Sequence, residues 1–381
     1  MHVVWLFEYP TLNGGERSLL ATLPTLRSEG IEPISLGPAV GPLATELARK
    51  GVAYVPFDTF DPGGQKLPRD VLRQLLADHL SRLRPALLDA NSLSMGRLSG
   101  PVARANVPSI AHLRDIVGLS QAAVADLNCH TRLLAVSHAT RDFHLRQGVD
   151  AARTLVCYNG VDLTRFRPQP PTGRLHLQLG LPRDAVLVAA IGQIIHRKGQ
   201  DVVICAARQL ERRLARLHWL IVGERHSQKP EAAEYEAALH AEIRSAGLTD
   251  RIHFLGTTDG VEKLLPELTL LVHAARQEPL GRVLLEAASA GVPCVASDVG
   301  GTREIFPDST FARLIPPNDP DALTEAVAAL VENPAERERL AHSARRRMAA
   351  MFDADSAGKA LAEHYREVSR DGSSLHRASE R

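Results

Sequence analysis

The sequence predicts an α/β fold made of two similar halves, each a mainly parallel sheet covered by helices. Short apolar runs, each of the length of a buried strand, alternate with helical patterns along nearly the whole chain. Several of these runs end in a glycine turn that leads directly into a helix, as in doubly wound α/β folds. The length of 381 residues is ample for two or three domains with sizeable cores.

Composition argues against several classes of protein. The chain has 45 basic and 44 acidic residues, and its formal net charge of +1 does not predict a broad surface for nucleic acid. No apolar run reaches the roughly 18 residues of a membrane span. Residues 1–9 lack the basic start of a signal peptide, so this apolar run is interpreted as a strand. Peripheral contact with a membrane stays open.

The spacing of cysteine and histidine limits the chemistry further. The four cysteines lie far apart and form no CxxC pair, which predicts buried thiols in a reducing compartment and hence a cytoplasmic protein. The sixteen histidines show no metal-site spacing such as HExxH, so no metal site is predicted.

The first half begins with a strand, a glycine turn and a helix. The apolar run His2–Tyr9 ends at a proline, and the turn that follows contains Gly14 and Gly15. A helix is expected from near Glu16 to Gly30. This layout places backbone N–H groups where a phosphate can bind, although a tight turn without any ligand has the same pattern.

The alternation of strand and helix continues through the rest of this half. A loop at residues 58–68, rich in glycine, proline and aspartate, is a place where an acceptor could bind. Strands are expected at residues 33–36, 53–57, 86–90, 109–112, 133–136 and 154–158, and helices at 42–50, 71–83 and 138–148.

His112 ends one of these strands and is the best candidate in this half for a hydrogen bond to a substrate. The alternative is a histidine satisfied within the core or a loop, because histidine is intermediate in burial. Nearby, Arg114 could bind an anionic group or pair with Asp115.

The second half follows a proline-rich linker at residues 168–171 and repeats the same architecture. Its first strand, 185–191, leads into a loop that contains Gln193, Lys198 and Gly199, and then into a helix from Gln200 to Leu210. Further strands are expected at 219–222, 252–255, 268–272, 294–297 and 314–315, and helices at 231–246, 261–265, 282–289, 321–331, 335–351 and 356–368.

Residues 273–305 form the stretch around which the chain is organised. Glu278 precedes a proline, which favours an extended loop, and Gly281 relaxes the turn before a helix that carries Glu286. The start of that helix offers free N–H groups to a phosphate, and the two carboxylates could accept hydrogen bonds from sugar or ribose hydroxyls. A second turn, Gly300-Gly301, permits another close approach of backbone.

In this setting, two glutamates with seven residues between them resemble the EX7E pattern of retaining GT-B glycosyltransferases, specifically family 4. The family's GG(x)ER, NGVDxxxF.P, KG and FLG segments have counterparts here in the same order, so the resemblance covers nearly the whole chain. One departure is clear. The family usually has arginine where this chain has Gln193, which keeps hydrogen-bond donors but not the charge; Arg197 or Arg282 could compensate.

The resemblance implies a GT-B fold, with two Rossmann-like domains whose parallel sheets face an interdomain cleft. The acceptor-side domain would span residues 1–165, joined by the C-terminal helix 353–369. The donor domain would span 172–350, and residues 370–381 would form a flexible tail.

The same resemblance implies roles for individual residues. The predicted catalytic residues are His112, Glu278 and Lys198. Glu278 and His112 would orient the sugar, Glu286 would hold the ribose, and Lys198 would offset the charge of the leaving diphosphate. The predicted donor-binding residues are Gly14, Gly15, Gln193, Lys198, Glu224, Leu255, Glu278, Leu280, Gly281, Arg282 and Glu286.

The function implied is transfer of a hexosyl group from a UDP- or GDP-sugar, with retention, no cofactor and no metal. The acceptor stays open among a glycan, a lipid, a small molecule, a protein and a nucleic acid. The alternatives are a non-catalytic nucleotide-sugar binding protein and a GT-B nucleotide-sugar epimerase.

Overall fold

The computed structural model describes residues 1–258 and 260–379, with side chains up to residue 370. It divides into two compact units, residues 1–160 with 354–381 and residues 161–353. The tail predicted for residues 370–381 falls almost wholly on positions whose side chains lie outside the described part of the chain.

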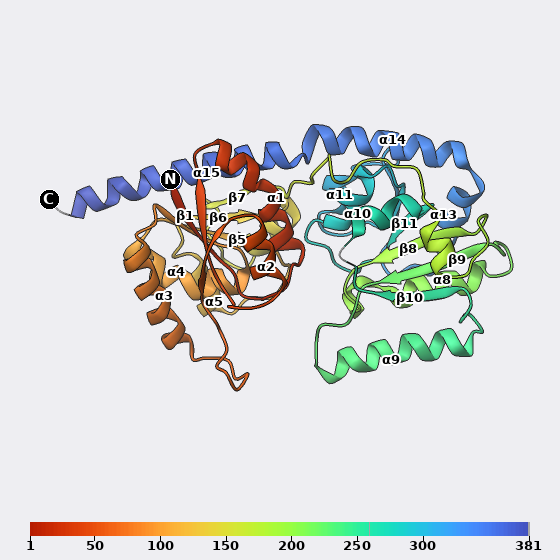
Figure 1. The fold of residues 1–381 in the computed structure, drawn as a ribbon, viewed down its shortest axis with the longest axis horizontal. Helices are drawn as coiled ribbons and strands as arrows, with labels where there is room; N and C mark the ends of the chain where they lie inside the picture. The colour runs from red at the N-terminus through yellow and green to blue at the C-terminus, as the bar shows by residue number, and fades with distance from the viewer. Residues whose placement is uncertain (259, 380–381) are drawn as a thin grey trace. The chain divides into compact units, whose positions relative to one another are not determined.

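The first unit is built on a twisted sheet flanked by helices (Figure 1). The sheet has seven strands in the order β3-β2-β1-β4-β5-β6-β7, and every pairing is parallel. Alternate residues of β1 face opposite sides: Val4 and Leu6 join one core, and Val3 and Trp5 join the other. The strands are β1 (His2–Leu6), β2 (Glu32–Gly37), β3 (Ala53–Pro56), β4 (Leu87–Ala90), β5 (Ser109–Leu113), β6 (Arg132–Ala135) and β7 (Thr154–Val156).

Helices cover both faces of this sheet. One core contains residues of α3, α4 and α5, and the other contains residues of α1, α2 and the last helix, α15. Gly358 of α15 lies so close to Thr25 of α1 that an added Cβ would be 2.7 Å from the threonine Cβ. The helices are α1 (Gly14–Ser28), α2 (Pro42–Arg49), α3 (Arg69–Leu83), α4 (Leu93–Asn106), α5 (Gln121–Leu127), α6 (His138–Leu145) and α15 (Ala354–Ser379).

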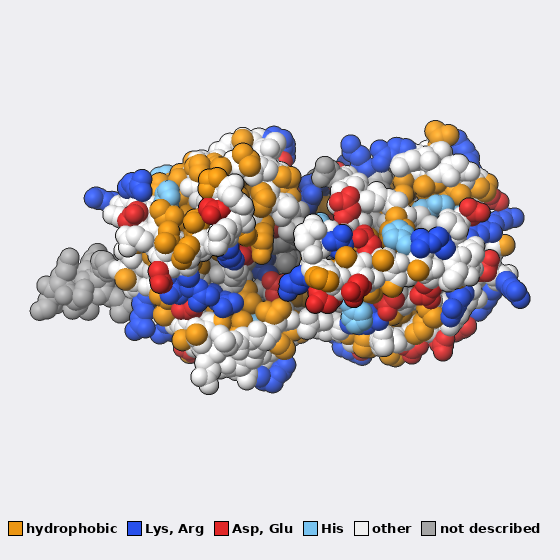
Figure 2. Space-filling view, turned by 90° about the horizontal axis from the view of Figure 1, so that it is seen from below, with side chains coloured by type: hydrophobic (Ala, Val, Ile, Leu, Met, Phe, Trp, Pro, Cys, Tyr) orange, Lys and Arg blue, Asp and Glu red, His pale blue; other side chains and the backbone are white. Residues whose placement is uncertain are grey.

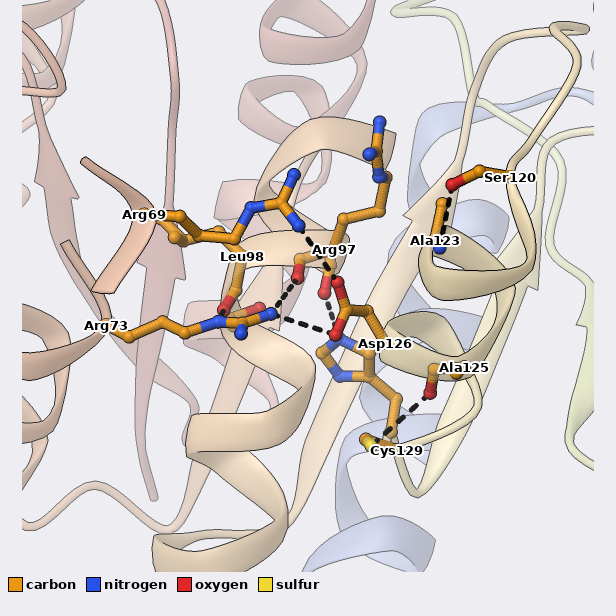
Figure 3. A network of polar contacts seen from close by, with 12 residues as sticks. Arg69, Arg73, Arg97, Leu98, Ser120, Ala123, Ala125, Asp126 and Cys129 are labelled. Atoms are coloured by element: carbon orange, nitrogen blue, oxygen red, sulfur yellow. Dashed lines mark hydrogen bonds and ion pairs between the residues drawn. The ribbon is translucent and has the colours of Figure 1, made fainter. Parts of the chain in front are cut away.

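The helices α4 and α5 were not expected from the sequence, and packing explains them. Glycine is a poor helix former, but an added Cβ at Gly100 of α4 would lie 2.0 Å from the Asp126 carbonyl oxygen of α5. Figure 3 shows the polar side of this contact, where Arg73 of α3 donates to the Asp126 carboxylate at 2.8 Å and to the Leu98 carbonyl at 3.2 Å. The close packing of α4 on α5 therefore requires glycine at position 100, although glycine lowers the helix propensity of this segment.

The second unit has a six-stranded parallel sheet in the order β10-β9-β8-β11-β12-β13. Its strands are β8 (Val186–Ile191), β9 (Leu217–Val222), β10 (Ile252–Gly256), β11 (Leu270–His273), β12 (Cys294–Ser297) and β13 (Arg313–Ile315). Its helices are α7 (Arg174–Gln178), α8 (Gln200–Leu210), α9 (Pro230–Ser245), α10 (Val261–Leu264), α11 (Arg282–Ser289), α12 (Thr302–Ile305), α13 (Pro320–Glu332) and α14 (Pro334–Met351), with 3₁₀ turns η1 (His196–Lys198) and η2 (Leu265–Glu267).

Both sheets reverse their strand order once, between β1 and β4 in the first unit and between β8 and β11 in the second. In open α/β sheets, ligands bind outside the carboxyl ends of the strands at such a reversal. The α/β prediction is confirmed, and the two reversals locate the edges where functional side chains are expected.

The surface charges and the cysteines of the described residues can be compared with the expectations from the sequence. Figure 2 shows basic and acidic side chains interspersed, in keeping with a net charge of +1. Cys294 is buried as expected, whereas Cys129, Cys157 and Cys205 are partly exposed, and all four are free thiols. Of the helices described, none has the length and apolar character needed to cross a membrane.

Candidate functional site

The carboxyl edge of the second unit brings the loops after β8 and β11 into direct contact. Gly199 has φ of +70°, and an added Cβ there would lie 2.0 Å from the Ala274 carbonyl oxygen. The Arg276 N–H donates to the Arg197 carbonyl at 2.8 Å. These contacts fix the loop that carries Lys198 against the loop that carries Glu278.

Glu278 is the central residue of this edge. Its side chain is buried, and its Oε2 atom lies 2.5 Å from Lys198 Nζ and 2.7 Å from His273 Nε2. Burial by itself would raise the Glu278 pKa, but Lys198 and His273 outweigh it and hold that pKa well below its usual range. Within the described residues, Oε1 accepts no hydrogen bond from the protein. The carboxylate is therefore ionised, fixed through one oxygen and able to bind a ligand through the other.

The backbone of the loop around Glu278 contacts the second glycine turn, Gly300-Gly301. The Gly301 N–H donates to the Glu278 carbonyl at 3.0 Å. Gly300 has φ of +51°, and an added Cβ would lie 1.9 Å from the same carbonyl oxygen. The close backbone approach predicted for Gly300-Gly301 is confirmed. Leu280 is buried, and Gly281, with φ of +112°, is the residue directly before α11.

Glu286 lies on α11 as predicted and is buried. Arg282, one turn earlier, approaches it with Nε 2.7 Å from Oε1. Arg282 is thus engaged with Glu286, which weakens the expectation that it replaces the charge missing at Gln193. The role of Glu286 in holding a ribose stays a prediction.

Three other side chains of the second unit bear on the missing charge. Arg276 is committed to Asp201 at 2.6 Å and to Asn318 at 2.7 Å. Arg197 donates one hydrogen bond, from NH1 to the Gln277 carbonyl at 3.2 Å, and its charge contributes to lowering the His273 pKa. The Gln193 carbonyl accepts from Gln200 at 2.9 Å. Arg197 therefore keeps guanidinium donors that no described residue is seen to occupy.

Glu224 and Leu255, both predicted to lie near the donor, follow and end neighbouring strands of the same edge. Gly256 pairs with Val222 across β10 and β9. Glu224 Oε1 accepts from the Thr257 N–H at 3.3 Å. Leu255 is half-buried. Their donor-binding roles stay predictions.

In the first unit, Gly14 and Gly15 differ slightly from the expectation. They form the first turn of α1 and do not precede it, because the Glu16 carboxylate accepts from the Asn13 N–H at 3.0 Å and starts the helix two residues early. Their N–H groups remain near the positive end of the helix dipole.

His112 lies in a closed, buried network under α15. Its Nε2 atom is 3.2 Å from Asp89 Oδ2, the Tyr365 hydroxyl donates to the same carboxylate, and Trp5 Nε1 donates to that hydroxyl at 3.0 Å. Burial lowers the His112 pKa and favours a neutral ring. The geometry is that of a satisfied core histidine, and contact with a substrate stays a prediction.

Arg114 is the basic group at the carboxyl edge of the first unit. It donates to the Asn91 carbonyl at 3.0 Å and to Asn159 Oδ1 at 2.7 Å. An added Cβ on Gly15 would lie 3.0 Å from Arg114 Cδ, so the arginine stem packs on the start of α1.

His273 was missed as a site residue. The sequence identifies it as the end of a strand but gives no sign that its side chain meets a carboxylate five residues later. Among the described residues, no group of three or more histidine, cysteine or acidic side chains is arranged to hold a metal ion.

Two family models match the chain. The model for glycosyl transferases group 1 matches residues 174–347, and the model for glycosyltransferase family 4 matches residues 12–165. Together they cover most of the second unit and of the first, apart from the C-terminal helix α15.

Curated relatives agree with these models. A lipopolysaccharide core biosynthesis mannosyltransferase, LpcC of Rhizobium leguminosarum bv. viciae, is 29% identical over 219 residues, which is 58% of this chain and 61% of the relative. An alpha-maltose-1-phosphate synthase of Mycobacterium tuberculosis is 30% identical over 251 residues, 62% of this chain and 63% of the relative. The matched region spans less than two thirds of each of these relatives.

Solved structures share the whole fold. HepE of Anabaena in complex with UDP-glucose has a TM-score of 0.85 at 24% identity, over 96% of this chain and all of that one. Sucrose-phosphate synthase of Thermosynechococcus elongatus has a TM-score of 0.78 at 20% identity, over 96% of this chain and 98% of that one. At these identities the likeness establishes the fold.

Proposed function

The chain belongs to glycosyltransferase family 4 and has the GT-B fold, and we propose that it transfers a hexosyl group from a UDP- or GDP-sugar to an acceptor with retention at the anomeric carbon. Glu278 carries the proposal. Its free Oε1 atom lies at the carboxyl edge where the sheet reverses, and its other oxygen is fixed by Lys198 and His273.

An ionised carboxylate with one free oxygen suits a sugar hydroxyl, which can donate a hydrogen bond to it. The low pKa of Glu278 keeps the group from donating a proton as a general acid. The two hydrogen bonds to Oε2 also withdraw electron density and disfavour nucleophilic attack. Glu278 thus serves to orient the sugar, and the departing phosphate is the base we propose for the acceptor's proton.

The charge that grows on the leaving diphosphate needs preorganised donors. Lys198 lies beside Glu278 and can reach a phosphate from there. The N–H groups at the start of α11 add the positive end of a helix dipole. In the first unit, the start of α1 and Arg114 offer the same chemistry to an anionic group.

Arg197 is the residue we propose to replace the charge absent at Gln193. It lies one position before Lys198, and among the described residues its one hydrogen bond goes to the Gln277 carbonyl. Arg282 and Arg276 are engaged with Glu286 and Asp201. A guanidinium at Arg197 can therefore contact a diphosphate without breaking an ion pair.

The reaction is proposed to proceed without a metal, because lysine, arginine and helix N-termini supply the positive charge. Turnover measured with excess EDTA should equal turnover without it. A loss of activity that Mg²⁺ or Mn²⁺ restores would contradict this part of the proposal.

The direct test is incubation with a panel of UDP- and GDP-sugars and acceptors, with detection of free nucleoside diphosphate and of the anomeric configuration by NMR. The acceptors should include inositol 3-phosphate and a lipopolysaccharide core. One relative of this chain is a D-inositol 3-phosphate glycosyltransferase, and another is the lipopolysaccharide core biosynthesis mannosyltransferase named above. Glycosylated product with the donor's configuration supports the proposal. Binding without turnover would indicate a sugar-nucleotide binding protein, and an altered sugar nucleotide without free diphosphate would indicate an epimerase.

A further inference from the structure

His273 makes a buried contact that the proposed reaction does not yet use. It is the last residue of β11, its exposure is 3%, and its Nε2 atom lies 2.7 Å from Glu278 Oε2. The strand is paired on both sides, with β8 and with β12, so the backbone that carries this ring is fixed. The ring therefore holds the Glu278 carboxylate from a strand whose backbone is paired on both sides.

The protonation state of this pair follows from its surroundings. Burial, and then the charge of Lys198, lower the His273 pKa, so the ring is neutral. Glu278 is ionised and can only accept hydrogen bonds. The single ring proton must then sit on Nε2 and point at Glu278 Oε2.

The two donors to Glu278 Oε2 differ in how easily a bound ligand could draw them away. Lys198 lies at the end of a short 3₁₀ turn, η1, and reaches Glu278 through a flexible four-carbon stem with three donor hydrogens. A diphosphate carries more negative charge than a carboxylate and competes directly for this ammonium. His273 has one donor hydrogen, a short side chain and a buried position, so its bond to Glu278 is shielded from the edge.

We propose that His273 is a positioning residue that keeps Glu278 oriented, with Oε1 toward the sugar, after the diphosphate has drawn Lys198 away. This inference rests on the proposed glycosyl transfer. In this proposal the ion pair between Lys198 and Glu278 is present only without ligand. The hydrogen bond from His273 to Glu278 is present with and without the diphosphate.

The test compares His273→Leu, which removes the donor, with His273→Gln, whose amide nitrogen can reach the place of Nε2. A hydrogen bond to a charged group supports an effect of about 10- to 100-fold. We expect kcat of the leucine variant to fall by that factor. The glutamine variant should recover most of the loss, and the affinity for the nucleoside diphosphate alone should not change in either.

A double variant separates this role from a merely structural one. If His273 acts through Glu278, His273→Leu combined with Glu278→Gln should be no slower than Glu278→Gln alone. His218→Leu is the matched control, since His218 is also a buried histidine on a strand of this sheet and is bonded to another side chain. It should leave kcat unchanged, and thermal unfolding of each variant should confirm that it is folded.

The outcomes are distinct. A folded leucine variant with wild-type kcat, or losses that simply multiply in the double variant, would overturn the role of His273 while leaving glycosyl transfer intact. A wild-type protein without turnover on any nucleotide sugar would overturn both. In ¹⁵N-histidine NMR, the His273 ring should show its proton on Nε2 with and without the nucleoside diphosphate; a proton on Nδ1 would also contradict the proposal.

Discussion

The two units place a buried histidine and a carboxylate near the carboxyl edge of a parallel sheet, yet the two pairs are built differently. In the first unit, Asp89 receives both His112 and Tyr365, and the network ends at Trp5 inside the core. In the second, Glu278 receives Lys198 and His273 through one oxygen and keeps the other available. The first network is enclosed in the core, where Asp89 Oδ1 lies 3.1 Å from His112 Nε2 without a hydrogen bond of its own. The second lies on a loop at the carboxyl edge of its sheet.

This difference shows that a histidine at a strand end is a weak indicator of a site. His112 is the second-last residue of β5 and His273 the last residue of β11, and both are buried and neutral. Only the partner distinguishes them: Asp89 is enclosed under α15, whereas Glu278 lies on a loop held by two glycines. The place of the carboxylate, on a loop at the carboxyl edge of the sheet and not within the core, is the better criterion for function.

The largest expected effect comes from removing the lysine of an ion pair, and it should differ between the two units. Lys198→Met leaves Glu278 buried with His273 alone, and we expect a loss of about 3 kcal/mol in unfolding free energy and about 100-fold in kcat/KM. The control is Lys66→Met in the first unit. Lys66 pairs with Glu8 but is 55% exposed, so its loss should cost under about 1 kcal/mol. Equal effects in denaturant titrations would remove the contrast.

The pH dependence of stability should reveal the buried neutral histidines of both units. Burial lowers the pKa of His130 to about 4 and lowers those of His112 and His273. Below about pH 6.5 the unfolded chain takes up protons that the folded chain refuses, so stability is lost as the pH falls. For His130 alone this amounts to about 2 kcal/mol at pH 5. An unfolding free energy that is flat between pH 7 and 5 would contradict these assignments.

A smaller effect tests whether the network in the first unit is closed. Tyr365→Phe removes a donor to Asp89 and the acceptor of Trp5, and should cost about 1–3 kcal/mol in unfolding free energy. Tyr235→Phe is the matched change in the second unit. There, Asp201 keeps its bond to Arg276, so under about 1 kcal/mol is expected. The reverse order of the two effects would show that the first network is not closed.

The smallest effect concerns the missing arginine. Arg197→Gln should weaken nucleoside diphosphate binding by about tenfold in calorimetry, because one charge-assisted hydrogen bond is lost. Gln193→Arg should improve binding only slightly in the wild type and clearly more in the Arg197→Gln background. Equal gains in both backgrounds would show that Arg197 does not supply the charge.

Periodicity and turn residues predicted most of the framework. The helix Gln200–Leu210, the helix Arg282–Ser289 and the strand Cys294–Ser297 have the predicted ends, because glycine, proline and apolar runs encode them locally. The helix α4 was missed, because Gly96 and Gly100 lower its helix propensity and are required only by packing against residues that are distant in sequence. Strand order likewise depends on long-range pairing.

The site was predictable where chemistry and turn geometry coincide. Glu278, Lys198 and Gly281 stand at strand–turn–helix junctions, and the structure brings them to one edge. The part played by His273 could not be predicted, because the direction of a strand's last side chain depends on the path of a loop that follows it. The engagement of Arg282 with Glu286 was also missed, although residues four apart on a helix are neighbours.

Hydrogen exchange measured with and without the nucleotide sugar tests most directly whether the donor binds at the carboxyl edge of β8 and β11. Peptides that cover residues 192–199 and 276–282 should exchange more slowly when the ligand is bound, and peptides that cover α3 and α5 of the first unit should not change. Slower exchange in α3 and α5, with no change at residues 192–199 and 276–282, would contradict the account.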